Sequence, residues 1–78
     1  MSIVRRLGDP PKLRGSGTME TCPDIFELSD GNFAVIGTEA TEDLDSLLPP
    51  DAARADYERI VIISRDTLLR AKRDIPDA

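Results

Sequence analysis

Few side chains in this sequence could do covalent or acid–base chemistry. Histidine is absent and Cys22 is the only cysteine, so the chain cannot assemble a Ser-His or Cys-His pair to activate a nucleophile. Ser64 precedes an amphipathic stretch, which favours a helix N-cap over a nucleophile. Cys22 lies beside Pro23 without a resolving cysteine, which favours an anchoring or exposed thiol over a redox centre. We expect no catalytic residues and a non-enzymatic protein.

Carboxylates are the most numerous candidates for ligand binding. The densest group is Glu39, Glu42, Asp43 and Asp45. Carboxylate oxygens suit a hard cation, but this stretch lacks the central glycine and terminal glutamate of the twelve-residue calcium loop. A hydrated acidic surface is the preferred interpretation. The glycine-containing stretch 15–17 is not followed by the Lys-Ser or Lys-Thr of a phosphate loop. We expect no metal ion and no cofactor.

Length and charge limit the class of protein. A chain of 78 residues makes one small domain, near the size at which a single core is marginal and a partner often completes it. Fifteen acidic and ten basic residues give a net charge of -5, which argues against general nucleic-acid affinity. Residues 39–58 carry seven acids against one arginine, whereas residues 59–73 carry five basic residues against one aspartate. No apolar run is long enough for a bilayer span or a signal-peptide core, so we expect a cytoplasmic protein.

The stretch 24–37 is predicted to form the β-hairpin that organises the fold. Asp30-Gly31 suits a two-residue type I′ turn, which needs positive φ at both central positions. That turn pairs Leu28 with Phe33 and sets the register of both strands. The face that would pack in the core holds Phe26, Leu28, Phe33 and Val35. The opposite face would hold Ile25, Glu27, Ala34 and Ile36.

The segments around the hairpin complete a small α+β domain. Residues 1–21 are predicted to be a flexible N-terminal arm, in which Ile3 and Val4 could add an edge strand. Residues 22–76 form the domain. Thr41 is interpreted as the N-cap of a short helix, with Leu44, Leu47 and Leu48 on one face, which ends at Pro49-Pro50.

The C-terminal third is predicted to supply a strand and a helix. The run 59–63 is rich in β-branched residues, which is typical of a strand buried on both faces, here beside the hairpin. A helix then runs from Ser64 to Pro76. Its apolar side would hold Leu68, Leu69, Ala71, Lys72 and Ile75. The expected fold is a three-stranded, mostly antiparallel sheet in the order ββαβα, with the C-terminal helix packed on one face.

The segments CPDIFELSDGNFAVIG and ERIVIISRDTLLRAKRDIP resemble a group of short, uncharacterised actinobacterial proteins. The shared features are a Cys-Pro-Asp start, an Asp-Gly hairpin, an acidic proline-containing middle and a closing strand and helix. The likeness covers residues 22–76 and implies no activity. The chain is also similar to a small actinobacterial domain encoded beside helix-turn-helix regulators, although it lacks the tryptophan of that domain's closing helix. This second likeness implies a regulatory setting.

These features favour a protein-interaction or regulatory module, with a homodimer or another protein, such as a transcriptional regulator, as partner. The expected contact residues are Ile25, Ala34 and Ile36 on the second sheet face, with Glu42, Asp43 and Asp45 supplying charge complementarity. The alternative is a small-molecule or nucleic-acid binder that uses the basic C-terminal helix. A third possibility is an enzyme subunit or accessory factor that a partner chain completes.

Overall fold

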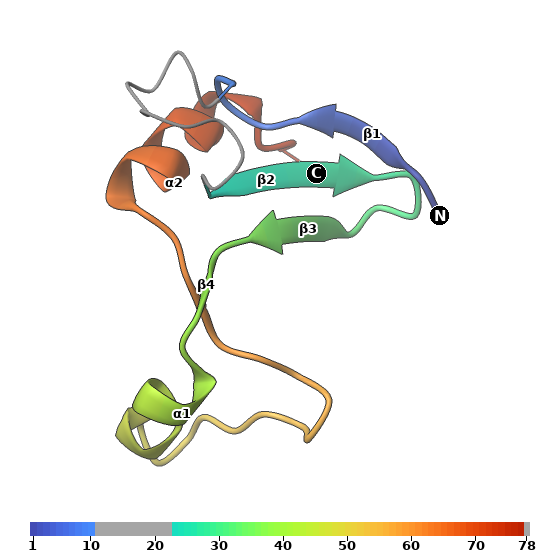
Figure 1. Cartoon of the computed structure of the whole chain (residues 1–78). Helices are drawn as coiled ribbons and strands as arrows, with labels where there is room; N and C mark the ends of the chain where they lie inside the picture. Colours follow the sequence, from blue (N-terminus) through green and yellow to red (C-terminus); the bar gives the residue numbers. More distant parts are fainter. Residues whose placement is uncertain (11–22, 78) are drawn as a thin grey trace.

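The structure is a computed structural model that describes residues 1–10 and 23–77. The strands are β1 (Ile3–Arg6), β2 (Asp24–Leu28), β3 (Phe33–Ile36), β4 (Thr38–Glu39) and β5 (Val61–Ile62). The helices are α1 (Thr41–Leu44) and α2 (Arg65–Ala71), each continued by a 3₁₀ turn, η2 (Asp45–Leu47) and η3 (Lys72–Asp74). Figure 1 shows two parts, which we name the sheet lobe (residues 1–10, 23–36 and 63–77) and the ribbon lobe (residues 37–62).

The sheet lobe contains a three-stranded antiparallel sheet in the order β1-β2-β3. This confirms a small α+β fold, but the third strand is β1 and not the run 59–63. Strand β1 lies within the stretch predicted to be a flexible arm. For residues 3–6 the structure instead shows the other possibility, in which Ile3 and Val4 add an edge strand to the sheet. Leu7 of that arm is buried in the core and Asp9 pairs with Arg70, so the prediction of a flexible arm was wrong for these residues also. Residues 11–21 of the arm, and Cys22, lie outside the described residues.

The hairpin forms where Asp30-Gly31 predicts it, but with a longer turn. Only Gly31 has a positive φ, of 91°. The Leu28 N–H donates to the Asn32 carbonyl at 2.9 Å, and the Gly31 N–H donates to the Leu28 carbonyl at 3.1 Å. These bonds enclose a three-residue loop, the arrangement in which a type I turn is followed by a left-handed glycine. The type I′ prediction was therefore wrong.

The longer turn slips the hairpin register by one residue. Ile25 lies opposite Val35, and Phe26 lies opposite Ala34. A one-residue slip exchanges the faces of one strand relative to the other. The four residues predicted to share the core face, Phe26, Leu28, Phe33 and Val35, are therefore divided between the two faces of the sheet. One face holds Phe26, Leu28, Ala34 and Ile36. The other face holds Ile25, Glu27, Phe33 and Val35.

The core of the sheet lobe is small and lies on the face of Ile25. Leu7, Ile25 and Ala71 are buried together, with Ile63 packed against them. Helix α2 approaches the chain so closely that a Cβ at Gly8, where φ is 86°, would lie 3.1 Å from a backbone carbon of Arg70. Glycine is therefore required at position 8 both by conformation and by space.

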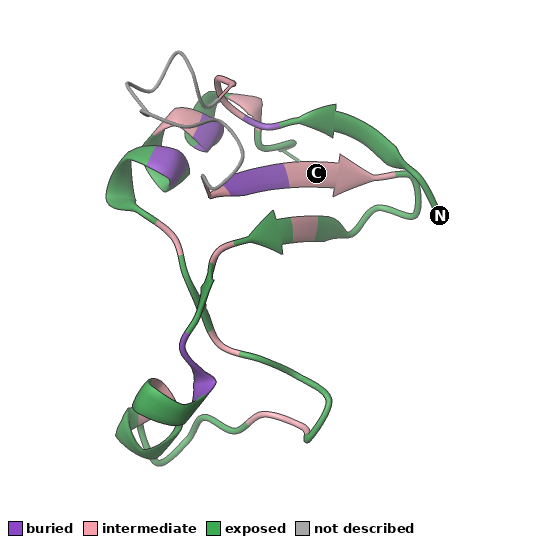
Figure 2. Ribbon diagram, viewed as in Figure 1, coloured by how far each residue is buried: buried purple, intermediate pink, exposed green. Residues whose placement is uncertain are grey.

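Helix α2 begins where the sequence predicts but buries a different side. The Ser64 hydroxyl accepts the Thr67 N–H at 3.1 Å, which confirms Ser64 as the N-cap. The buried residues of the helix are Thr67 and Ala71, one turn apart. Leu68 and Leu69, predicted to pack on the sheet, are 54% and 58% exposed. Figure 2 shows how little of the helix is buried.

The ribbon lobe projects from the sheet as a separate arm (Figure 1). Strand β5 pairs with β4, Thr38 opposite Ile62, in a two-stranded ladder. The prediction that residues 59–63 form a strand buried on both faces was therefore wrong, since Ile62 is 50% exposed. At the start of α1 the N-cap residue is Ala40, which has no side-chain cap, and Thr41 is instead the first helical residue.

Candidate interaction site

The face of the sheet that carries Phe26 is the largest candidate surface, and we call it the open face. Its apolar residues are Phe26, Leu28, Ala34 and Ile36. Helix α2 lies on the opposite face against Ile25, and the C-terminal Ile75 and Pro76 border a hollow with Phe33, also on that opposite face. The open face is thus left without a covering helix in the described part of the chain. Ile36 is 55% exposed, while Phe26, Leu28 and Ala34 are half-buried.

An ion pair between Arg6 and Asp24 lies at one end of the open face. The Arg6 Nε donates to both carboxylate oxygens of Asp24 at 3.0 Å. The Arg6 guanidinium also lies 5.3 Å from the centre of the Phe26 ring. The Asp24 side chain is only 7% exposed, so its charge needs this partner, and it also accepts the Ile25 N–H. Arg6 therefore holds the Phe26 ring in place and limits the water around it.

The structure separates the predicted contact residues into two groups. Ala34 and Ile36 lie on the open face, as predicted. Ile25 is 7% exposed and belongs to the core, so it cannot contact a partner, which corrects its assignment. The cause is the one-residue register slip. Glu42 and Asp43 are exposed on α1, at the far end of the molecule from the sheet (Figure 1).

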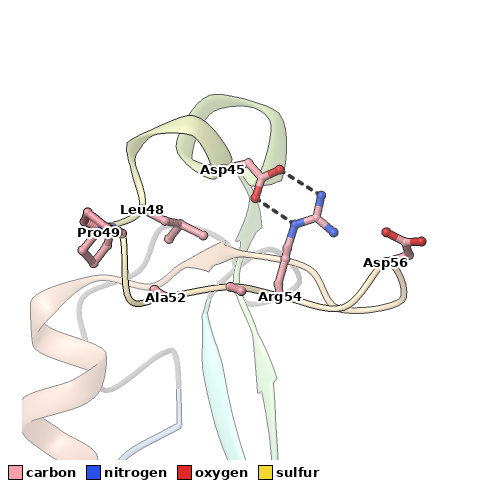
Figure 3. Close-up of a pocket in the computed structure, with 8 residues that line it drawn as sticks. Asp45, Leu48, Pro49, Ala52, Arg54 and Asp56 are labelled. Carbon is pink, nitrogen blue, oxygen red and sulfur yellow. Dashed lines mark hydrogen bonds and ion pairs between the residues drawn. The ribbon is translucent and has the colours of Figure 1, made fainter.

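Asp45 has a structural partner. Its Oδ1 and Oδ2 accept hydrogen bonds from Arg54 Nε at 3.1 Å and Nη2 at 3.2 Å. The remaining Arg54 nitrogen, Nη1, donates to the carbonyls of Ala55 and Glu58. Figure 3 shows this pair beside a hollow of about 420 Å³. Because each guanidinium nitrogen already donates within the chain, Arg54 is a brace for the loop and not a ligand-binding cation.

A buried hydroxyl organises the start of α1. Thr41 is 2% exposed, and its Oγ1 accepts the Ile60 N–H at 2.8 Å. Glu39 accepts the Thr41 N–H at 2.9 Å and forms an ion pair with Arg59 at 3.3 Å. Hydrogen bonds from the Thr41 hydroxyl, the Thr41 N–H and Arg59 lower the pKa of Glu39 from 4.5 to about 2. Glu39 is thus a structural carboxylate, as Asp45 is, unlike Glu42 and Asp43 of the acidic group.

Two basic side chains near the C-terminus, those of Arg70 and Arg73, are engaged by acids. Asp9 accepts from Arg70 Nη1 at 2.8 Å and from Arg73 Nη2 at 2.6 Å. These bonds, that from Arg73 first, lower the pKa of Asp9. Arg70 also pairs with Asp66. The charges of Arg70 and Arg73, the two side chains on which the nucleic-acid alternative rests most, are therefore compensated locally, which gives less support to that alternative.

Some exposed apolar residues were not anticipated as contact residues. Leu68 and Leu69 lie exposed on α2, and Phe26 and Leu28 lie on the open face. The face of Phe26 and Leu28 could have been predicted from the turn. A three-residue loop at Ser29-Asp30-Gly31 gives the register that places both side chains on the open face. For the two leucines, the i and i+4 spacing of the small residues Thr67 and Ala71 was the available signal.

The described residues contain no group of three or more metal-ligating side chains. None of their helices has the length and hydropathy needed to cross a bilayer.

Comparisons with family models, curated proteins and solved structures found no match for this chain. The resemblance to actinobacterial proteins stays a prediction, and the function must be argued from the geometry.

Proposed function

We propose that the protein is a non-enzymatic protein-interaction module that binds a regulatory protein through the open face. The single observation that carries this proposal is the exposure of large apolar side chains. In the described residues, Leu7, Ile25, Ala40 and Ala71 are the only buried apolar residues, whereas on the open face Ile36 is 55% exposed and Ile3, which lies opposite Leu28, is 61% exposed. Exposed apolar surface of this extent marks an interaction site in soluble proteins.

The dimensions of the chain support the same proposal. Its accessible surface is 5972 Å², against about 4,700 Å² for a compact monomer of this mass. Its radius of gyration is 14.0 Å, against about 11.5 Å for a compact chain of this length. A standard protein–protein interface buries about 800 Å² per partner. The surplus area is therefore large enough to supply one side of an interface.

The chemistry of the surface indicates the kind of partner. The open face offers Phe26, Leu28 and Ile36 as apolar contacts, with the Arg6–Asp24 pair at its border. Glu42 and Asp43, on the ribbon lobe, form no ion pair with the described residues and extend the surface with negative charge. A partner with an apolar patch and a separate basic patch would match both lobes, and DNA-binding regulators carry such basic surfaces.

Site-specific photo-crosslinking in cells tests this proposal. A photoreactive residue in place of Ile36 should give one discrete adduct with a second protein, because this side chain lies on the open face. The matched control places the same residue at Asp77, which is exposed near the C-terminus. The same adduct from both positions, or none from position 36, would contradict the proposal.

The purified partner allows a quantitative test of both lobes. Ile36→Asp should weaken binding by roughly 10-fold to 100-fold, because it places a charge in an apolar contact. The double variant Glu42→Gln with Asp43→Asn should weaken binding less and should reduce its salt dependence. Binding that is unaffected by Ile36→Asp would show that the partner uses another surface.

A further inference from the structure

The hydrogen-bond pattern of the sheet shows which backbone groups of β3 point away from it. The Ile25 carbonyl accepts the Leu7 N–H, and the Ser29 N–H donates to the Ser2 carbonyl, both at 2.9 Å. Odd-numbered residues of β2 therefore face β1, and its even-numbered residues face β3. Because Phe26 lies opposite Ala34, the even-numbered residues of β3 bond to β2. Phe33 and Val35 direct their backbone N–H and C=O groups to the outer side.

The same outer side continues beyond β3. The Ala40 N–H donates to the Ile60 carbonyl at 2.9 Å, so the even-numbered residues around β4 face β5. The odd-numbered residues of β3 and β4 therefore point to the same side of the chain, which turns between the two strands (Figure 1). Within the described residues no strand pairs with this side, since the sheet order ends at β3 and the ribbon consists of β4 and β5 alone.

The edge of β3 is short, at four residues, but it lacks charge, proline and a covering segment among the described residues. Residues 33–38 read FAVIGT, with no charge and no proline. Phe33 and Val35 are each 45% exposed. Soluble proteins normally protect an edge strand with lysine, proline, a bulge or a covering segment. An uncharged apolar edge with unpaired backbone groups is a template for another strand.

We propose that a second copy of this chain pairs with this edge, antiparallel and centred on Val35. A two-fold axis through Val35 sets the outward residues against one another, Val35 opposite Val35 and Phe33 opposite the second copy's Gly37. Two-fold symmetry requires an antiparallel arrangement, so the same edge is complementary to itself. The two sheets join into one six-stranded sheet.

The centre at Val35 follows from the neighbouring residues. If the two-fold axis passed through Ala34 instead, fewer of the residues whose backbone groups point outward would pair with the second copy. Gly37 would then lie outside the ladder. A centre one residue later would set Phe33 opposite the carboxylate of Glu39. At Val35 the ring of Phe33 lies over a glycine, which has no side chain to displace. This dimer goes beyond the proposed function, because it needs no other protein and leaves the open face free.

The oligomeric state tests the proposal. Sedimentation equilibrium of the full chain should give twice the mass of the 8.6 kDa chain. Val35→Lys should raise the dimer dissociation constant roughly 100-fold or more, because it sets like charges opposite one another at the axis. Val61→Lys is the matched control, since Val61 is the same residue type on the exposed ribbon, and it should leave the dimer intact. Circular dichroism of both variants checks that the fold is retained.

Disulfide formation tests the register. In a Cys22→Ser background, Val35→Cys should crosslink rapidly to itself under mild oxidation, because residues opposite one another lie within the Cα separation of a disulfide. Phe33→Cys should not, because two copies of residue 33 lie four residues out of register. A wild-type chain that stays monomeric at several hundred micromolar, a dimer that survives Val35→Lys, or faster crosslinking at position 33 would each overturn the proposal. The dimer sets Ile36 opposite Ala34 of the second copy, so an adduct of position 36 with a second copy of this chain reports the dimer, and only an adduct with a different protein supports the proposed function.

Discussion

The sheet lobe and the ribbon lobe are held together by different interactions. The sheet lobe has an apolar core of Leu7, Ile25 and Ala71. The ribbon lobe has Thr41, a polar residue, as its most buried side chain, and Arg54 braces its loop through four hydrogen bonds. Hydrophobic burial is non-directional, whereas hydrogen bonds fail when a single partner is removed.

The difference shows how one short chain forms two structural units. Too few large apolar residues are buried to enclose both lobes in one core, so the second unit relies on polar contacts. We expect the ribbon lobe to open at a lower free energy than the sheet lobe, because it has few buried apolar contacts.

The largest effect is expected at Ile25. Ile25→Ala should lower the free energy of unfolding by about 2–4 kcal/mol, because it leaves a cavity beside Leu7 and Ala71. Ile36→Ala is the matched control and should cost less than about 1 kcal/mol, since Ile36 is 55% exposed. Urea denaturation of both variants at one protein concentration measures the difference. Equal losses would place both side chains on one face and contradict the observed register.

The same pair of residues shows what the sequence could predict. The Asp-Gly signal correctly located the hairpin, but it did not separate a two-residue type I′ turn from a three-residue loop, because both end on glycine. The loop length alone decides whether Ile25 is in the core or on the surface. The N-cap at Ser64 was predictable from local chemistry. The pairing of β5 with β4 was not, because strand pairing depends on contacts distant in sequence.

A second prediction concerns the buried hydroxyl of the ribbon lobe. Thr41→Val keeps the shape of the side chain but removes the acceptor of the Ile60 N–H and a donor to Glu39. We expect a loss of about 1–3 kcal/mol, because a buried N–H is left unsatisfied. Amide hydrogen exchange should show the loss in residues 38–62 first. Thr38→Val, at an exposed position, should have little effect. A loss shared equally by both lobes would show that they unfold as one unit.

Arg54 provides a third and smaller test. Arg54→Lys retains the charge but cannot make the two-point contact with Asp45 and also bond the carbonyls of Ala55 and Glu58. We expect a loss of about 1 kcal/mol, with faster amide exchange in the loop 54–58. Arg59→Lys is the control, since Arg59 makes one exposed ion pair. If Arg59→Lys had the larger effect, the bracing role of Arg54 would be wrong.

The smallest effect is expected from acid. The pKa of Glu39 is lowered to about 2 in the folded chain from its ordinary 4.5. A lowered pKa stabilises the fold above pH 4.5, and the contribution is lost as the pH falls from 4.5 toward 2. Glu39→Gln should therefore reduce stability at neutral pH and flatten its pH dependence in this window. Glu42→Gln removes a charge from the same lobe without these partners and should not flatten it.

The candidate site was predictable only in part. Ala34 and Ile36 were placed on the exposed side of the sheet because alternation within a single strand is independent of register. Ile25 was misplaced because its face depends on the turn. Asp45 was grouped with Glu42 and Asp43 by charge, but its pairing with Arg54 depends on a loop conformation that composition does not specify.

The most direct test of the central claim is the pattern of cross-strand Hα–Hα nuclear Overhauser effects in the hairpin. Pairs that do not bond to each other bring their Cα atoms to about 4.5 Å. The observed register predicts strong effects between Ile25 and Val35 and between Glu27 and Phe33. Strong effects between Phe26 and Val35, or between Leu28 and Phe33, which are the close pairs of the two-residue-turn register, would contradict it and would return Phe26 and Leu28 to the face that packs in the core.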